Sequence, residues 1–376
     1  MYWQNFQLIR TLIDNIGPVA ALAFSPDGLL LAIGSCDSSV KLFQVATGDR
    51  ERTLFGYPLG VGCLSISPDG NLLAIGAPDG NIDLWQLENG KFLGKMALKG
   101  RVTSIAFSPD GEIIASGSDR SLIDTVFAIS PTQTGSEQSA GGAIKLWDAN
   151  TGHLKQLLCE SDTPVNTLAI SPDGTKLASG HRDGTIKIWQ LGDGRLLHIL
   201  RGHTDAVYTI AIALVSPPVM PTKDPANSAM NSSIKGDREE ESSRLRDNAR
   251  ESKPDQNLGT KFKNNLKSQL LVSGSGDGTI RLWDLETGSS SKTLADHTDV
   301  VYSLSISPNG QTLASGSGDG TIKLWKLDGT LLQTLSSSSG PPRAIMSVAF
   351  SPNSSLLASG SGDGRIHIWQ GMGNRE

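Results

Sequence analysis

A segment of about 42 residues recurs seven times along this chain of 376 residues. Each copy closes on an aromatic residue, and these residues are Phe43, Trp85, Trp147, Trp189, Trp283, Trp325 and Trp369. Their successive separations are 42, 62, 42, 94, 42 and 44 residues, so the third and fifth copies carry about 20 and about 52 extra residues. A repeat unit of this length cannot bury its apolar face alone, so the copies must pack against one another.

Each copy has the sequence pattern of short antiparallel strands. Polar and apolar residues alternate at 301–306 and again at 321–325, as they do in half-buried strands. Tight turns are supplied by Ser-Pro-Asp-Gly or Ser-Pro-Asn, because proline presets φ and glycine tolerates positive φ. These turns begin at Ser25, Ser67, Ser108, Ser171, Ser307 and Ser351. The pattern predicts an all-β protein.

The repeat resembles the WD-repeat (WD40) family of β-propellers. The resemblance is carried by the period, by Gly202-His203 before a first strand, and by Trp147-Asp148 and Trp283-Asp284 at the end of third strands. It covers nearly the whole chain apart from two insertions. It implies a single domain over residues 1–376, a seven-bladed propeller whose blades are four-stranded antiparallel sheets.

The first residues are expected to close the ring. The chain runs only seven residues beyond Trp369, so the seventh repeat lacks a fourth strand of its own. Leu12 lies seven residues before Val19, the spacing that separates Leu54 from Val61. We therefore expect residues of about 6–12 to pair with the last blade, which would cover an open sheet edge.

Two copies contain a Ser-His-Asp set that has two interpretations. One is nucleophilic catalysis. The other follows from the family resemblance, which implies a buried hydrogen-bond chain from Trp through Ser and His to Asp that stabilises the blade. We favour the second interpretation, because two identical catalytic sites one repeat apart are better explained as architecture. The residues are His203, Ser273, Asp277 and Trp283 in repeat five, and His297, Ser315, Asp319 and Trp325 in repeat six.

The other repeats depart from this pattern at the histidine position. Repeats one to four hold Asn15, Tyr57, Leu98 and Ser161 there. Their blades are therefore expected to be held mainly by strand pairing and apolar burial, and to be the less rigid part of the ring.

Two insertions interrupt the repeats. The insertion at about 121–142 falls between the second and third strands of blade 3, and its apolar start favours packing on the rim over direct contact with a partner. The insertion at about 214–268 falls between the first and second strands of blade 5. It has few large apolar residues, so we expect it to be disordered. It is either a solvated loop or a binding segment that folds on contact.

Family members often bind peptides on the face that carries the Asp-Gly turns. The resemblance places Tyr208, Tyr302 and Met346 on that face in three consecutive blades, a composition typical of interface hot spots. Arg101, Arg182 and Asn166 would lie across the channel mouth from them. This arrangement suggests a ligand with an apolar anchor and an acidic group, although the same residues could be ordinary surface positions.

Composition excludes several functional classes. A net charge of −5 argues against binding to nucleic acid. The sequence shows no phosphate-binding glycine loop and no metal-ligand spacing, so we expect no cofactor and no metal. Cys36, Cys63 and Cys159 have no disulfide-like spacing, and no signal peptide or membrane-spanning run is evident, which favours a cytoplasmic location.

These observations predict a non-catalytic scaffold for protein–protein interaction, built as a monomeric propeller. Its partner would bind on the Asp-Gly-turn face. The alternatives are a regulatory or sensing propeller that acts on a separate effector and a propeller enzyme. Fold alone does not choose among them.

Overall fold

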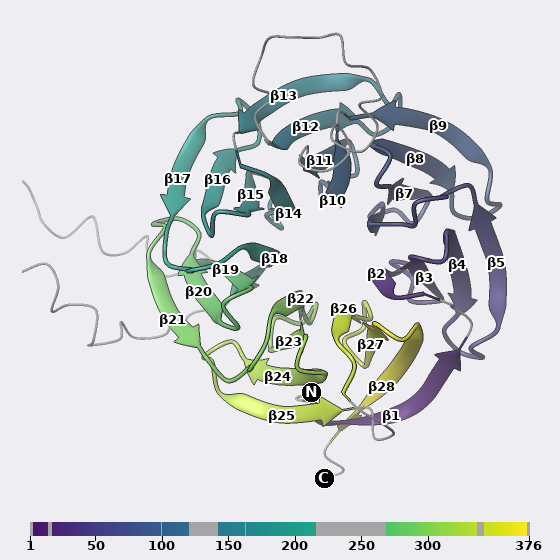
Figure 1. Cartoon of the computed structure of the whole chain (residues 1–376), viewed down its shortest axis with the longest axis vertical. Coiled ribbons are helices and arrows are strands. Elements are labelled where there is room, and N and C mark those ends of the chain that lie inside the picture. The colour runs from purple at the N-terminus through teal and green to yellow at the C-terminus, as the bar shows by residue number, and fades with distance from the viewer. Residues whose placement is uncertain are drawn as a thin grey trace, which may run out of the picture.

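The chain folds into a ring of seven sheets around a central channel (Figure 1). The computed structural model describes residues 3–13, 17–98, 100–119, 142–161, 163–215, 268–336 and 342–373. Within these residues each sheet has four antiparallel strands, and no helix occurs. The predicted fold class, an all-β seven-bladed propeller, is confirmed.

Every blade runs from an inner strand at the channel to an outer strand at the rim (Figure 1). The inner strands are β2 (Val19–Phe24), β6 (Cys63–Ile66), β10 (Arg101–Phe107), β14 (Val165–Ile170), β18 (Val207–Val215), β22 (Val301–Ile306) and β26 (Ile345–Phe350). The second strands are β3 (Leu30–Ser35), β7 (Leu72–Gly76), β11 (Ile113–Asp119), β15 (Lys176–His181), β19 (Ser268–Ser275), β23 (Thr312–Ser317) and β27 (Leu356–Ser361).

The third strands carry the aromatic residue that closes each repeat. They are β4 (Ser39–Gln44), β8 (Asn81–Gln86), β12 (Gly142–Asp148), β16 (Ile186–Gln190), β20 (Ile280–Asp284), β24 (Thr321–Lys326) and β28 (Arg365–Gly373). The outer strands are β5 (Arg50–Phe55), β9 (Phe92–Ala97), β13 (Leu154–Ser161), β17 (Leu196–Leu200), β21 (Ser290–Leu294), β25 (Leu331–Ser336) and β1 (Trp3–Ile13).

Strand β1 closes the ring by completing blade 7. It pairs antiparallel with β28, and the register places Leu12 opposite Ile366 and Phe6 opposite Gly371. Phe6 is 2% exposed and packs edge-on against Phe350 of the inner strand β26. The expectation that the first residues supply the missing outer strand is confirmed, and the strand is longer at both ends than predicted.

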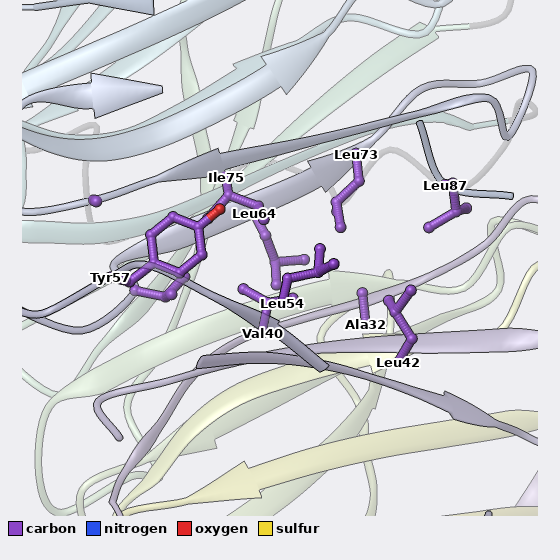
Figure 2. Close-up of a cluster of buried hydrophobic side chains, with 11 residues drawn as sticks. Ala32, Val40, Leu42, Leu54, Tyr57, Leu64, Leu73, Ile75 and Leu87 are labelled. Carbon is purple, nitrogen blue, oxygen red and sulfur yellow. The ribbon is translucent and has the colours of Figure 1, made fainter. Parts of the chain in front are cut away.

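The hydrophobic core is divided among the interfaces between neighbouring blades. Figure 2 shows the interface of blades 1 and 2, where Val40 and Leu42 face Leu64 and Leu73. Second strands such as β3 have neighbours on both faces, so they are apolar along nearly their whole length instead of alternating. Burying each side chain of this size contributes about 1.5–3 kcal/mol. Blade-to-blade contact is therefore the main source of stability.

A second set of contacts joins the blades at the outer rim. One position of every outer strand lies opposite the residue that precedes the closing aromatic of the third strand. In six blades the side chain at this position hydrogen-bonds a backbone carbonyl of the following blade. These side chains are Arg10, Arg52, Gln156, His198, Lys292 and Gln333. In blade 2 the position is Gly94, so the interface of blades 2 and 3 lacks this bridge.

The two predicted insertions fall almost wholly outside the described residues. Strand β11 ends at Asp119 and β12 begins at Gly142, while β18 ends at Val215 and β19 begins at Ser268. The expectations of rim packing and of disorder therefore stay predictions.

Candidate functional site

The inner strands share a β-bulge near the end where they enter the channel face. In six blades the pairing register skips one residue, and the skipped residues are Ala20, Thr103, Asn166, Tyr208, Tyr302 and Met346. In blade 2 the corresponding residue is Gly62, directly before β6. A bulge leaves its extra residue out of the ladder and turns that side chain away from the regular alternation.

These seven residues line one cavity of about 420 Å³, which we call the mouth cavity. It lies on the face of the Asp-Gly turns, because its wall also contains Cys36 and Pro78, the residues before the turn aspartates of blades 1 and 2. Every blade contributes to it, so the cavity sits at the end of the central channel.

Blades 5 to 7 form an aromatic and apolar side of the mouth cavity. The rings of Tyr208 and Tyr302 meet edge to face, with centroids 5.7 Å apart and an interplanar angle of 67°. Tyr208 is 41% exposed, while Met346 of the next blade is half-buried. Burial, and then the carboxylate of Asp299, raises the pKa of Tyr302, so this hydroxyl stays protonated at neutral pH.

Blades 2 and 3 form the opposite side, which combines a cation with apolar surface. The Arg101 guanidinium lies 3.6 Å from the buried carboxylate of Asp119, yet the Arg101 side chain remains 43% exposed. Leu59, which also lines the cavity, is 52% exposed. The cavity therefore offers a positive group on one side and two tyrosines on the other.

Polar side chains on the inner strands fix the spacing of the blades around the cavity. Thr103 Oγ1 donates to the carbonyl of Val165 at 2.6 Å, and Asn166 Nδ2 donates to the carbonyl of Val207 at 3.2 Å. Each bond joins one blade to the next. Asn166 thus lines the cavity while its amide is engaged in a structural contact.

The Ser-His-Asp set of repeat five forms a continuous buried chain. Trp283 Nε1 donates to Ser273 Oγ at 2.9 Å, and His203 Nε2 lies 2.8 Å from the same oxygen. His203 Nδ1 lies 3.0 Å from Asp277 Oδ2. All partners are satisfied when His203 is neutral, donates from Nδ1 and accepts the Ser273 proton at Nε2. Burial lowers the pKa of His203, in agreement with the neutral form.

Repeat six repeats this geometry with nearly the same distances. Trp325 Nε1 donates to Ser315 Oγ at 2.9 Å, His297 Nε2 lies 2.8 Å from that oxygen, and His297 Nδ1 lies 2.8 Å from Asp319 Oδ2. Ser273 and Ser315 are both 0% exposed. A substrate carbonyl therefore has no access to either hydroxyl.

The comparison with protein families identifies the repeat. The WD40 family model, described as WD domain, G-beta repeat, matches residues 6–44, 48–86, 90–123, 152–190, 262–284, 288–326 and 329–370. The chain belongs to the WD40 repeat family.

Characterised relatives match parts of the WD40 chain. Autophagy-related protein 16 of Arabidopsis thaliana is 28% identical over 172 residues, which is 45% of this chain and 31% of that protein. Nuclear distribution protein PAC1 of Gibberella zeae is 31% identical over 166 residues, 42% of this chain and 34% of that protein. WD repeat and SOCS box-containing protein 1 of Homo sapiens is 40% identical over 74 residues, which is 19% of this chain and 18% of that protein. The matches thus span about a third or less of each relative.

Five of the six predicted partner-binding residues of this WD40 propeller line the mouth cavity. They are Arg101, Asn166, Tyr208, Tyr302 and Met346. Arg182 is exposed but is not part of the cavity wall. Sequence reasoning missed Leu59, Val61 and Val102, which also line it. The exposed Leu59 follows Tyr57-Pro58, a turn unlike those of other repeats, and this is the one signal that could have pointed to it.

The WD40 blades without a histidine before the first strand have other polar anchors. In blade 4, His181 comes from β15 itself: its Nε2 lies 2.9 Å from Ser179 Oγ, which also accepts the Trp189 indole N–H. In blade 2, Trp85 Nε1 donates to the Tyr57 hydroxyl at 2.8 Å. Polar anchors therefore add to strand pairing and apolar burial in these two blades, and the expectation that blades one to four rely mainly on strand pairing and burial stays a prediction.

Blades 1, 3 and 7 use shorter anchors. Blade 1 has a buried ion pair in which Lys41 Nζ lies 2.9 Å from Asp37. In the described part of blade 3, Trp147 Nε1 donates to Ser116 Oγ at 2.8 Å. In blade 7, His367 on β28 bonds to Thr11 of β1 at 3.0 Å. Polar contacts therefore also hold the ring closure.

The described residues contain no group of three His, Cys, Asp or Glu side chains placed to hold a metal ion. Nor does any helix within them have the length and apolar character needed to cross a bilayer.

Proposed function

We propose that this chain is a non-catalytic scaffold that binds a segment of a protein partner in the mouth cavity. The observation that carries the proposal is the convergence of all seven bulge positions on one cavity, with Tyr208 and Tyr302 on one side and Arg101 on the other. The cavity is set in a closed ring whose blades are joined by hydrogen bonds. Such a platform binds without the cost of ordering itself.

The lining favours a ligand that carries an apolar anchor and an acidic group. Tyrosine and methionine provide contact area for an apolar side chain, and Tyr208 is already exposed to receive it. The exposed Arg101 guanidinium favours a carboxylate. Both interactions together would select one peptide orientation across the channel mouth.

Burial of the two serine hydroxyls supports a role without catalysis. Ser273 Oγ is shared between a histidine and a tryptophan and has no exposed surface. A nucleophile needs access to its substrate. A regulatory propeller that acts on a separate effector would use the same mouth cavity, so the identity of the partner decides between these two roles.

We also propose a cytoplasmic, monomeric propeller. The free thiols of Cys36 and Cys63 are consistent with a reducing compartment. The pairing of β1 with β28 gives the last blade its own outer strand, so ring closure needs no second copy.

Selection from a displayed peptide library tests the mouth cavity. Wild type is expected to select peptides that combine an aromatic or aliphatic residue with Asp or Glu. The double variant Tyr208→Ala, Tyr302→Ala should bind the selected peptides at least about tenfold more weakly, since interface tyrosines are frequent hot spots. Arg101→Ala should remove the preference for acidic peptides.

Arg182→Ala is the matched control, because Arg182 is exposed on the same face but outside the cavity wall. It should leave binding unchanged, and the melting temperature of each variant shows whether it remains folded. Equal binding by the double variant and wild type would rule out the mouth cavity as the binding site.

A further inference from the structure

A second cavity of about 450 Å³ lies between blades 1 and 2, on the face opposite the mouth cavity. We call it the blade 1–2 groove. Its walls are the Ser-Pro-Asp-Gly turn of blade 1, the start of β5, and the turns of blade 2 that end at Gly70 and follow β8. It therefore shares no residue with the mouth cavity.

The floor of the groove is apolar. Leu30 is half-buried and Leu87 is 4% exposed, while Leu29 at the edge is 65% exposed. Leu29 directly follows the glycine of its turn, a position that is polar in the other repeats with this turn: Asn71, Glu112, Thr175, Gln311 and Ser355. The exposed Leu29 therefore adds apolar surface to the edge of the groove at a position that is polar in these repeats.

Three carboxylates surround this floor. Asp27 comes from the blade 1 turn, Glu51 from β5 and Glu88 from the turn after β8. Asp27 Oδ1 accepts hydrogen bonds from Ser25 Oγ and from the Leu29 amide, so this carboxylate is held in place. Within the described part of the chain, none of the three carboxylates forms an ion pair.

The interface of blades 4 and 5 shows one way in which this space is filled. Lys176 holds the position of Leu30, two residues after the turn glycine, and its Nζ lies 2.6 Å from Glu286, the counterpart of Glu88. The stem of Lys176 is largely buried, with 13% of the side chain exposed. A lysine can cover apolar surface with its stem while its ammonium reaches a carboxylate.

A second donor present between blades 4 and 5 is also missing between blades 1 and 2. Gln269 Nε2 donates to Asp173 Oδ2 at 2.5 Å across the blade 4–5 interface. The corresponding Asn71 turns back to Asp69 of its own blade, at 2.6 Å. Asp27, the counterpart of Asp173, therefore receives no donor from blade 2. Both cross-blade donors are absent where the groove is open.

We infer that the blade 1–2 groove binds a lysine side chain on an exposed segment of a partner protein. The stem would lie on Leu29 and Leu30, and the ammonium would reach Glu88 in the way that Lys176 reaches Glu286. The groove is thus a second docking surface, independent of the mouth cavity and on the other face of the ring.

An array of nine-residue peptides, each with one central lysine between randomised residues, provides the probe. Matched arrays carry norleucine, which keeps the stem and removes the charge, or arginine in place of the lysine. Lysine peptides should bind to the full chain, and binding should weaken as salt is raised. Norleucine peptides should not bind, and arginine peptides should bind more weakly than lysine peptides.

Two variants locate the binding by opposite changes. Glu88→Gln removes the carboxylate at an exposed position, and Leu30→Lys supplies the internal lysine seen between blades 4 and 5. Each should weaken lysine peptides at least tenfold, as measured by fluorescence polarisation of the tightest peptide. Glu286→Gln, the same change at the filled interface, should have no effect, and neither should Tyr208→Ala with Tyr302→Ala.

The inference would be overturned by the absence of lysine-dependent binding, by full binding of lysine peptides to Glu88→Gln, or by a preference for arginine over lysine. Loss of binding in the double tyrosine variant would also overturn it, because the peptide would then occupy the mouth cavity. Melting temperatures of all variants show whether each remains folded, and Glu88→Gln decides alone if Leu30→Lys does not fold.

Discussion

Blades 3 and 5 are built from the same repeat but differ in how far their buried polar contacts extend. In both, a tryptophan on the third strand donates to a serine on the second strand, Trp147 to Ser116 and Trp283 to Ser273. In blade 5 the serine also bonds His203, which continues to Asp277. In blade 3 the histidine position holds Leu98, and the chain ends at the serine. The Trp–Ser hydrogen bond therefore forms even where the histidine and aspartate are absent.

The histidine and aspartate of blade 5 connect further segments of the chain to the sheet, whereas the Trp–Ser pair alone joins two strands. His203 lies in the connection from blade 4, and Asp277 lies in the turn after the second strand of blade 5. The full chain thus ties a connection, two strands and a turn into one network. Substituting a residue of these hydrogen-bonded networks should therefore lower stability most where the network contains the most residues.

The largest effect is expected from deleting residues 1–12, which removes both the outer strand of blade 7 and Thr11, the partner of His367. Loss of the buried Phe6 and Leu12 alone should cost about 3–6 kcal/mol, and the exposed edge of β28 should promote aggregation. Thermal unfolding and light scattering measure both outcomes. An unchanged melting temperature would contradict a closing role for β1.

The same substitution in two blades tests the comparison directly. Ser273→Ala removes the partner of both the Trp283 indole N–H and His203 Nε2, so it should cost about 2–4 kcal/mol. Ser116→Ala removes the partner of the Trp147 indole N–H and should cost about 1–2 kcal/mol. Urea unfolding of both variants gives the two values. Equal losses would mean that the histidine extension adds no stability.

Acid should weaken the part of the ring that carries buried histidines. Burial lowers the pKa of His203, His297 and His367, and lowers that of His181 to about 4. Unfolded histidine binds a proton near pH 6.5. The unfolded chain therefore binds more protons than the folded chain between these values, so stability is complete above about pH 6.5 and falls towards pH 4.

For His181 the full loss is about 3 kcal/mol, from a shift of 6.5 to about 4 at 1.36 kcal/mol per pKa unit. Blades 1 to 3 contain one histidine, the exposed His153. Hydrogen exchange at pH 5 should therefore show faster opening in blades 4 to 7 relative to pH 7, with little change in blades 1 to 3. Uniform acceleration around the ring would refute this assignment.

The smallest effect is expected at the rim between blades 2 and 3, where the side-chain bridge is missing. A Cβ at Gly94 would meet no atom within 4 Å, so Gly94→Gln can extend towards the carbonyls of the blade 3 turn, as Gln156 does towards blade 4. Replacing a strand glycine should add about 0.5–1 kcal/mol. Gln156→Gly is the reverse change and should lower stability by a similar amount. A loss of stability in Gly94→Gln would mean that an added side chain at this position does not bridge and stabilise the interface of blades 2 and 3.

Most of the fold could be predicted from the sequence because the chain is built from a repeat. The number of blades and the closing strand followed from spacing, because each copy has to meet identical neighbours and the last copy was one strand short. Four of the seven bulge residues at the channel mouth were also placed there by the family resemblance, namely Asn166, Tyr208, Tyr302 and Met346. Bulges at that position explain physically why residues outside the regular alternation point into one cavity.

The features that could not be predicted are those in which one repeat departs from the common pattern or depends on its neighbour in the ring. His181 stands two residues after Ser179, where blade 5 has Ser275 after Ser273, and it supplies a histidine from a different element. A search limited to the histidine before the first strand misses it. The blade 1–2 groove is also invisible in a single repeat, because it arises from Leu30 and Asn71 in two blades that meet only in the ring.

The pairing of β1 with β28 has a consequence for the order in which the molecule is made. Among the described strands, β1 is synthesised before its partner β28, from which it is separated by more than 350 residues. During translation, blades can form and pack against one another in order while β1 remains unpaired. The pairing of β1 with β28 then closes the ring across a very large sequence separation, and such contacts form slowly. Chaperones and peptide ligands that bind the chain on the ribosome would therefore contact an incomplete, open set of blades before the ring has closed.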